Sequence, residues 1–186
     1  GSANCALMGD ITTMTQIQDS ISVASVGAGQ LREHHITART SDDGSVEQML
    51  RDADECARGS NARLCRQFVV TGKTEPADAA TLEQLCRDAK CPITLITGKS
   101  SAPACAGGTQ ARAVAATSDM TAIRQDGRTV GMLYEDDRAR YCLLGEIRSA
   151  DVTGTRVDQA VETFDNMAEA LEQADMSFTD VARTWL

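Results

Sequence analysis

The sequence lacks several features that would each identify a class of protein. It has no apolar run that approaches the length of a membrane-spanning helix, about 18 residues. Its N-terminus also lacks the basic start and the apolar stretch of a secretory signal. It also lacks a basic excess, because 18 basic residues stand against 27 acidic ones for a net charge of −9. That balance argues against a broad nucleic-acid-binding face. We therefore expect a soluble protein with no nucleic-acid and no membrane partner.

The seven cysteines also lack the order of a disulfide framework or a zinc module. None are spaced as C-x-x-C, and no histidine pair is placed as in a zinc finger. An odd number of cysteines without such order indicates buried thiols in a reducing compartment. We expect cytoplasmic localisation, no metal and no cofactor, while a bridge between Cys86 and Cys91 stays open as an alternative.

The 186 residues, 42% of them apolar, suffice for one packed domain and part of a second. The clearest predicted helix covers about 155–174, where one face carries Val157, Val161, Phe164, Ala168 and Leu171. This face should be buried, with Phe164 and Leu171 against a sheet. A second helix is predicted over 45–59, where Ser-Val-Glu-Gln fits a capping box, and a third over about 81–90.

Short runs with strand character lie between these helices. The expected strands are 21–26, 33–40, 64–71, 92–97, 109–116, 129–134, 140–145 and 180–186. Strands that alternate with helices predict the α/β or α+β class and exclude a helical bundle or a sandwich. The order strand, strand, helix, strand occurs in both halves of the chain, which predicts an internal duplication.

The duplication predicts three segments. Residues 1–10 form a tail that begins with the apparent cloning scar Gly1-Ser2, residues 11–118 a divergent first domain, and residues 119–186 the start of a second. Under this reading a helix and two strands of the second copy would follow Leu186, so we expect that copy to be incomplete.

Motifs in the last third of the chain resemble the Rid (YjgF) superfamily. They are Leu143-Leu144-Gly145-Glu146, then Gly154, then the helix segment 159–167, Ala170-Leu171, and the turn Ser177-Phe178-Thr179-Asp180-Val181. The sequence departs from the family pattern at Leu144, Glu146 and Asp175. The resemblance implies an α+β, chorismate-mutase-like mixed sheet with helices packed on one face, and homo-oligomers, as trimers or pseudo-trimers, with pockets between neighbouring domains. Tandem members such as the chorismatases are similar in carrying a divergent first copy.

For function, the resemblance implies hydrolysis of enamine or imine intermediates that carry a small carboxylate, with water as co-substrate. The alternatives are a chorismatase-like tandem enzyme and a non-catalytic module for ligand binding or oligomerisation. The family's carboxylate-holding arginine lies on the strand after the second helix. The comparable segment 91–95 has no arginine. Catalytic residues therefore stay unknown, and we expect no imine hydrolysis by this chain.

Three residues are the candidates for ligand binding. Gly145 matches the family position, where a backbone without a side chain can approach a ligand. Tyr134 is a loose counterpart of a pocket tyrosine. Arg183 is an alternative anchor for a carboxylate, expected on a strand face with Val181 and Trp185, whereas Arg148 is expected to face solvent.

Other reactive residues have plainer interpretations. His34 and His35 would point to opposite faces of a strand, which indicates a surface or half-buried pair rather than a metal site. Cys105 and Cys142 have no neighbouring histidine in sequence and are expected to be inert thiols. Two further groups are expected to be a flexible connector and solvated turns: Gly107-Gly108-Thr109, and the acidic runs Asp42-Asp43 and Glu135-Asp136-Asp137.

Overall fold

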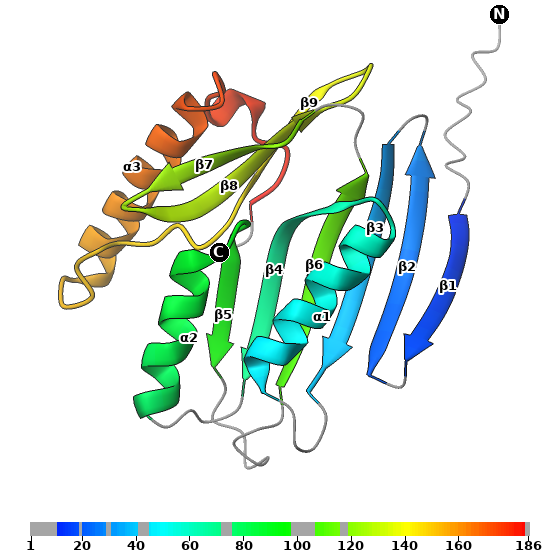
Figure 1. Ribbon diagram of the computed structural model, residues 1–186. Coiled ribbons are helices and arrows are strands. Elements are labelled where there is room, and N and C mark those ends of the chain that lie inside the picture. The colour runs from blue at the N-terminus through cyan, green and yellow to red at the C-terminus, as the bar shows by residue number, and fades with distance from the viewer. Residues whose placement is uncertain are drawn as a thin grey trace, which may run out of the picture.

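The computed structural model describes residues 11–18, 20–28, 31–40, 45–71, 76–97, 107–115 and 119–184. Within these ranges the fold is α+β, with a six-stranded mixed sheet, a three-stranded sheet and three α-helices (Figure 1). The α+β class predicted from the sequence is thus confirmed.

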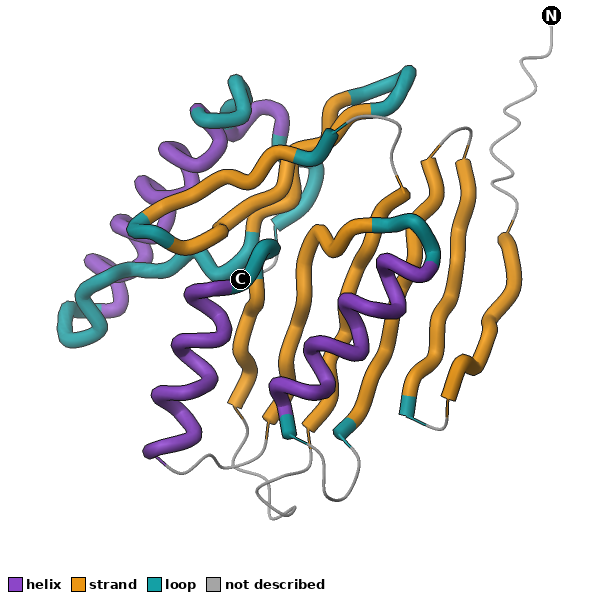
Figure 2. The backbone as a smooth tube through the Cα atoms, in the orientation of Figure 1, coloured by secondary structure: helices purple, strands orange, loops and turns teal. Residues whose placement is uncertain are grey.

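The six-stranded sheet has the strand order β1-β2-β3-β6-β4-β5. Its strands are β1 (Ile11–Gln18), β2 (Ile21–Ala28), β3 (Leu31–Arg39), β4 (Arg63–Thr71), β5 (Ile93–Thr97) and β6 (Gly107–Ala115). β4 and β5 pair in parallel because a helix carries the chain back between them, and the other neighbours are antiparallel. The helices α1 (Val46–Gly59) and α2 (Pro76–Asp88) lie on the same side of this sheet, which leaves its other face free of helices (Figures 1 and 2).

Helix α1 forms where the sequence predicts a capping signal and an apolar face. The Ser45 hydroxyl accepts a hydrogen bond from the Gln48 N–H at 3.1 Å, which satisfies a free backbone donor of the first turn. Met49, Ala53 and Ala57 recur at helical spacing and are fully buried against β3, β6 and β4. The predicted helix over 45–59 and its buried face are both confirmed.

The three-stranded sheet consists of β7 (Thr121–Gln125), β8 (Arg128–Glu135) and β9 (Arg140–Leu144), all antiparallel. Asp126 and Gly127 turn the chain between β7 and β8 with φ values of 49° and 76°. An Asp-Gly pair suits this turn because both residues tolerate positive φ. Helix α3 (Arg156–Glu172) packs against β7 and β9.

The central strand β8 joins the two halves of the molecule. Met132 and Tyr134 belong to the main hydrophobic core with residues of β2 to β6, while Val130 belongs to a smaller cluster with Ala170 and Ala174. The Thr129 hydroxyl donates a hydrogen bond to the Ala89 carbonyl at 2.9 Å. An ion pair of 2.6 Å between Arg128 and Glu83 lies beside it, so that β8 is held against the end of α2.

The predicted strand over 180–186 is wrong in its described part. Phe178–Asp180 form the 3-10 helix η1, and residues 181–184 have no strand hydrogen bonds; 185 and 186 lie outside the described residues. A strand needs a sheet edge to pair with, and among the described residues this segment meets none.

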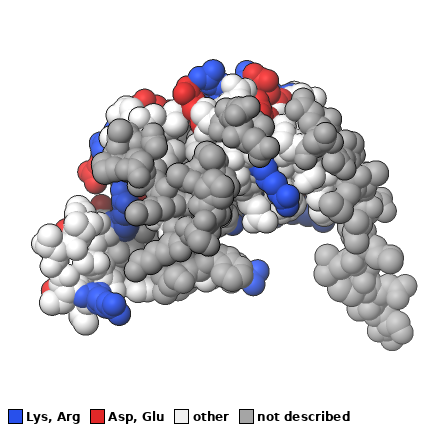
Figure 3. Space-filling model, turned by 90° about the horizontal axis from the view of Figure 1, so that it is seen from below, with Lys and Arg blue, Asp and Glu red and all other residues white. Residues whose placement is uncertain are grey.

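The predicted burial of α3 is wrong in the first half of the helix. Leu171 is only 4% exposed, but Phe164 is 42% and Val157 71% exposed. The three-stranded sheet reaches only the second half of the helix, where Gln125 of β7 donates to the Asn166 carbonyl at 2.7 Å. Figure 3, which views the molecule from below, shows charged side chains of both signs scattered among uncharged ones.

Other boundaries differ in smaller ways. Strands β1 and β7 are additional to the predicted ones, and α2 begins at Pro76 rather than near residue 81. The segment Gly107-Gly108-Thr109 is the start of β6 and not a flexible connector, since it pairs with both β3 and β4. No helix within the described ranges is long and apolar enough to cross a membrane.

Candidate functional site

A cavity of about 870 Å³ lies between the helix-free face of the large sheet and the second sheet. Strands β4, β5 and β6 supply one wall, and β8 and β9 supply the opposite wall. Helix α3 and residues 180–184 complete the lining. The cavity therefore exists because the second half of the chain packs on one end of the first sheet.

Arg66 of β4 stands in this cavity without a carboxylate partner. Its guanidinium lies over the ring of Phe68, with Cζ 4.5 Å from the ring centroid, and it forms no ion pair with any described residue. Burial, together with the neighbouring Arg112 guanidinium, lowers the pKa of Arg66. A bound anion would offset this repulsion, because it would neutralise a desolvated positive charge.

Arg112 of β6 is the cross-strand neighbour of Arg66. It is ion-paired with Glu33 of β3, yet its Nε atom is buried and has no hydrogen-bond partner among the described residues. Burial acts to lower the pKa of Arg112, but the hydrogen bond and charge of Glu33 outweigh it and raise the pKa. Arg112 is thus a fixed cation that retains one unused donor.

Tyr134 of β8 closes the cavity from the other side. The residue is 2% exposed, and its hydroxyl has no hydrogen-bond partner among the described residues. Its ring stacks on Tyr141 of β9, with centroids 5.2 Å apart. Burial raises the pKa of Tyr134, although the charge of Arg112 opposes the effect, so the phenol stays protonated and can donate. The tyrosine singled out from sequence does line the cavity.

Gly145 follows β9 at a point of close approach to β5. A Cβ atom here would lie 3.2 Å from the Pro92 Cβ and 3.5 Å from the Thr94 Oγ1, so a side chain would push the two segments apart. Its N–H donates to the Val130 carbonyl at 2.9 Å and is therefore already used. Gly145 lines the cavity, and its absent side chain serves the packing of the segment after β9 on β5.

A second set of arginines lies on the side of the cavity nearest α3. Arg183 is exposed in the irregular segment after η1 and therefore shares no strand face with Val181. Arg148 is 57% exposed, as expected, and pairs with Glu146 at 3.4 Å. Arg140 donates to the Ala174 carbonyl. The arginines on this side are more exposed than Arg66, and Arg140 and Arg148 both have partners.

The remaining sequence candidates lie elsewhere or are unreactive. His34 and His35 do point to opposite faces, but His34 is buried rather than half-buried, with Nδ1 2.8 Å from the Ser25 hydroxyl. Cys142 lines the cavity, yet burial raises its pKa to about 11 and keeps the thiol protonated. Cys86 and Cys91 are free thiols. Cys105 and the run Asp42-Asp43 lie outside the described residues.

Arg66 and Arg112 are the site residues that sequence reasoning missed. Each lies within a predicted strand, where it interrupts an otherwise apolar or small-residue pattern: Leu-Cys-Arg-Gln-Phe-Val-Val and Thr-Gln-Ala-Arg-Ala-Val-Ala. A charged residue inside such a strand is a signal for a half-buried functional position.

No family model matches this chain. No curated protein matches its sequence.

Proposed function

We propose that the cavity binds a small carboxylate-bearing metabolite, as the resemblance to the Rid superfamily implies. One observation carries this proposal: the Arg66 guanidinium lines the cavity and has no carboxylate partner among the described residues. The Arg112 Nε and the Tyr134 hydroxyl belong to residues of the same lining; both atoms are buried without a hydrogen-bond partner among the described residues, so a ligand would reach them only after a shift of these side chains. Unpartnered buried donors are costly, and a planar carboxylate held by guanidinium and phenol donors would satisfy them.

The fold supports the same proposal. A mixed sheet with two helices on one face is what a chorismate-mutase-like domain requires, and the first half of the chain has this arrangement. The order of three strands and then a helix recurs in β7, β8, β9 and α3. These features favour a tandem Rid-like protein, with the cavity between its two units. Homo-oligomers of trimer or pseudo-trimer type belong to the same proposal.

Binding can be tested by calorimetric titration of the chain with pyruvate. Arg66→Gln should weaken the affinity about 10- to 150-fold, the range expected for a hydrogen bond to a charged group. Tyr134→Phe should weaken it less, about 2- to 13-fold, because it removes a neutral donor. Arg63→Gln is the matched control: it changes the same residue type on the same strand, at an exposed position outside the cavity. Equal affinities of the Arg66 and Arg63 variants would refute the proposal.

Hydrolysis is a second candidate, and Glu146 favours it. This carboxylate lines the cavity, its side chain is 16% exposed, and its backbone has a φ of 57°, which is unusual for a glutamate. A carboxylate held in this way could accept a proton from water as the water adds to the imine carbon of a bound 2-iminopropionate, giving pyruvate and ammonia. The test is pyruvate release from freshly generated 2-aminoacrylate. Since the segment 91–95, the comparable strand of the first predicted domain, has no arginine, we expect binding without turnover. Turnover that Glu146→Gln abolishes would establish the enzyme.

A further inference from the structure

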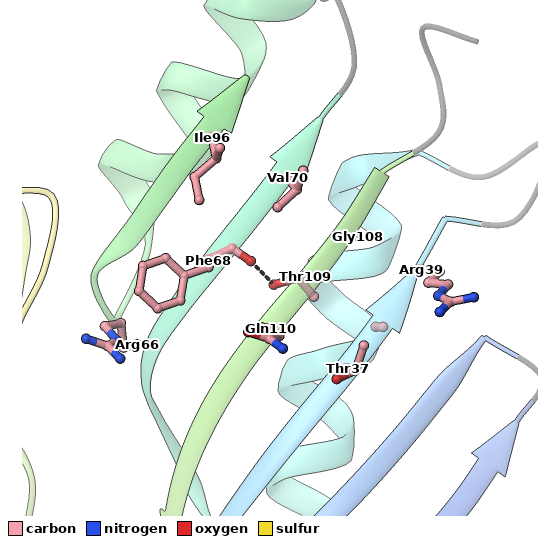
Figure 4. A pocket seen from close by; sticks show the side chains of 10 residues that line it. Thr37, Arg39, Arg66, Phe68, Val70, Ile96, Gly108, Thr109 and Gln110 are labelled. Carbon is pink, nitrogen blue, oxygen red and sulfur yellow. Dashed lines mark hydrogen bonds between the residues drawn. The ribbon is translucent and has the colours of Figure 1, made fainter. Parts of the chain in front are cut away.

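A groove of about 750 Å³ crosses the helix-free face of the large sheet and adjoins the cavity (Figure 4). Arg66 and Phe68 line both the groove and the cavity. In Figure 4 Phe68 lies between Arg66 on one side and Val70 and Ile96 on the other. The groove is thus a continuation of the cavity along β4, beyond the stacked pair of Arg66 and Phe68.

The strand register orders this face into three rows. Arg66 and Arg112 are cross-strand partners in a cationic row. The next row, two residues along, runs through Thr94, Phe68, Gln110 and Thr37. The third runs through Ile96, Val70, Gly108 and Arg39. At about 3.3 Å per residue, the first and third rows are about 13 Å apart.

The third row presents an apolar surface that the described residues leave open. Val70 is 50% exposed and its partner Ile96 is 46% exposed, so two large aliphatic side chains lie side by side in water. Gly108, the neighbour of Val70 on β6, adds no side chain to the floor of the groove. A Cβ atom there would contact only the Ala38 carbonyl oxygen, at 3.6 Å. An apolar surface next to an unpartnered guanidinium fits a ligand with one charged end and one apolar end.

We infer that the groove binds the apolar chain of the same ligand whose carboxylate lies at Arg66. The ligand class is therefore a carboxylate with an aliphatic tail, long enough to pass Phe68 and reach Val70 and Ile96. This inference rests on the proposed function. Charge argues for this occupant over a second copy of the chain, because a copy seated here would also bury Arg39 and Arg66. Neither forms an ion pair with a described residue, and burying unpaired charges is costly.

The experiment measures the affinity of the chain for a series of 2-oxo acids: pyruvate, 2-oxobutyrate, 2-oxohexanoate and 2-oxooctanoate. Complete burial of a methylene group raises the affinity about fourfold. The open groove would cover only one side of the ligand chain, so each added methylene should raise the affinity about twofold. The variant Val70→Thr with Ile96→Thr should flatten this dependence while leaving pyruvate affinity unchanged. Val161→Thr, on the exposed face of α3, is the control that should keep the full dependence.

The outcomes separate the two proposals. If pyruvate binds and Arg66→Gln weakens it, but affinity does not rise with chain length, the proposed function stands and the groove inference fails. If Arg66→Gln leaves pyruvate affinity unchanged, the proposed function fails and this inference fails with it. The mass of the chain in solution is measured for the same variants. A mass change in the Val70→Thr, Ile96→Thr variant, without any chain-length dependence in the parent, would assign the face to contacts between copies and overturn the inference.

Discussion

Helices α1 and α3 hold the same position in the order of elements but differ in how much of their apolar face is covered. Each follows three strands, β1 to β3 for α1 and β7 to β9 for α3. Met49 of α1 is 2% exposed and Ala53 fully buried. In α3, Val157 and Val161 are 71% and 57% exposed, and burial is confined to Ala170 and Leu171 near the end.

The difference arises from the strands that lie beside the third strand of each sheet. In the first sheet β6 and β4 lie next to β3, and α1 packs across all three. In the second sheet β9 is the edge among the described residues, and α3 has less surface to cover. An amphipathic pattern therefore predicts which face of a helix is available for packing, whereas the number of neighbouring strands decides whether that face is buried.

The largest effect expected from this comparison is on global stability. Met49→Ala should lower the free energy of unfolding by about 2–5 kcal/mol, because it leaves a cavity in the main core. Val161→Ala, the matched truncation on α3, should change it by less than about 0.5 kcal/mol. Urea unfolding followed by circular dichroism would measure both. Similar midpoints for the two variants would show that α3 is covered in solution.

A smaller loss of stability is expected from a substitution at Gly131 of β8, inside the three-stranded sheet. A Cβ there would lie 2.6 Å from the Leu144 Cδ2 and 3.1 Å from the Ile123 Cδ1. Gly131→Ala should therefore cost about 1–3 kcal/mol through overpacking. Gly59→Ala is the control, because nothing lies within 4 Å of its Cβ position. Equal unfolding midpoints for the two variants would contradict the packing of β8 on β9 and β7.

The smallest expected effect is on how the stability of the fold depends on pH, through Glu162 in the uncovered half of α3. Hydrogen bonds from the Ser149 hydroxyl and the Ala150 N–H lower the pKa of Glu162. Because the folded-state pKa is below the unfolded one, the ionised carboxylate stabilises the fold above its usual pKa, and this contribution disappears as the pH falls through the folded value. Glu162→Gln should reduce the loss of stability on acidification. Urea midpoints in a pH series through the glutamate range would measure it, and parallel curves for parent and variant would contradict the link.

Most of the fold could be predicted because its signals are local. Helix α1 has a capping serine and a regular apolar face, and strands such as β4 and β8 carry dense β-branched or apolar residues. Strand β1 was missed because Thr and Gln separate its few apolar residues, and β7 because only Ala122 and Ile123 are apolar. The exposure of Phe164 was not predictable, since it depends on strands remote from the helix.

The site was predictable only in part, because a β-bulge at Cys65 decides which residues of β4 and β6 lie opposite each other. The register of β4 on β6 shifts between Leu64 and Arg66: Leu64 faces Ala113, and Arg66 faces Arg112. Without this bulge Arg66 would face Ala111. No local sequence signal specifies the extra residue, so the pairing of the two arginines could not be foreseen. Tyr134, Gly145 and Arg183, by contrast, lie in the single segment that carries the family resemblance, and all three line the cavity.

The contact between β8 and the end of α2 has a consequence for how the chain folds. The Thr129 hydroxyl satisfies the Ala89 carbonyl after the end of α2, and Met132 and Tyr134 are part of the core built by the first sheet. The first 118 residues alone would leave that carbonyl and that part of the core open to water. The predicted boundary at residue 118 should therefore not divide the chain into two units that unfold separately: β7 and β8 should melt together with the large sheet, in one transition. The outer half of α3, which lacks these contacts, should exchange its amide hydrogens well before that transition.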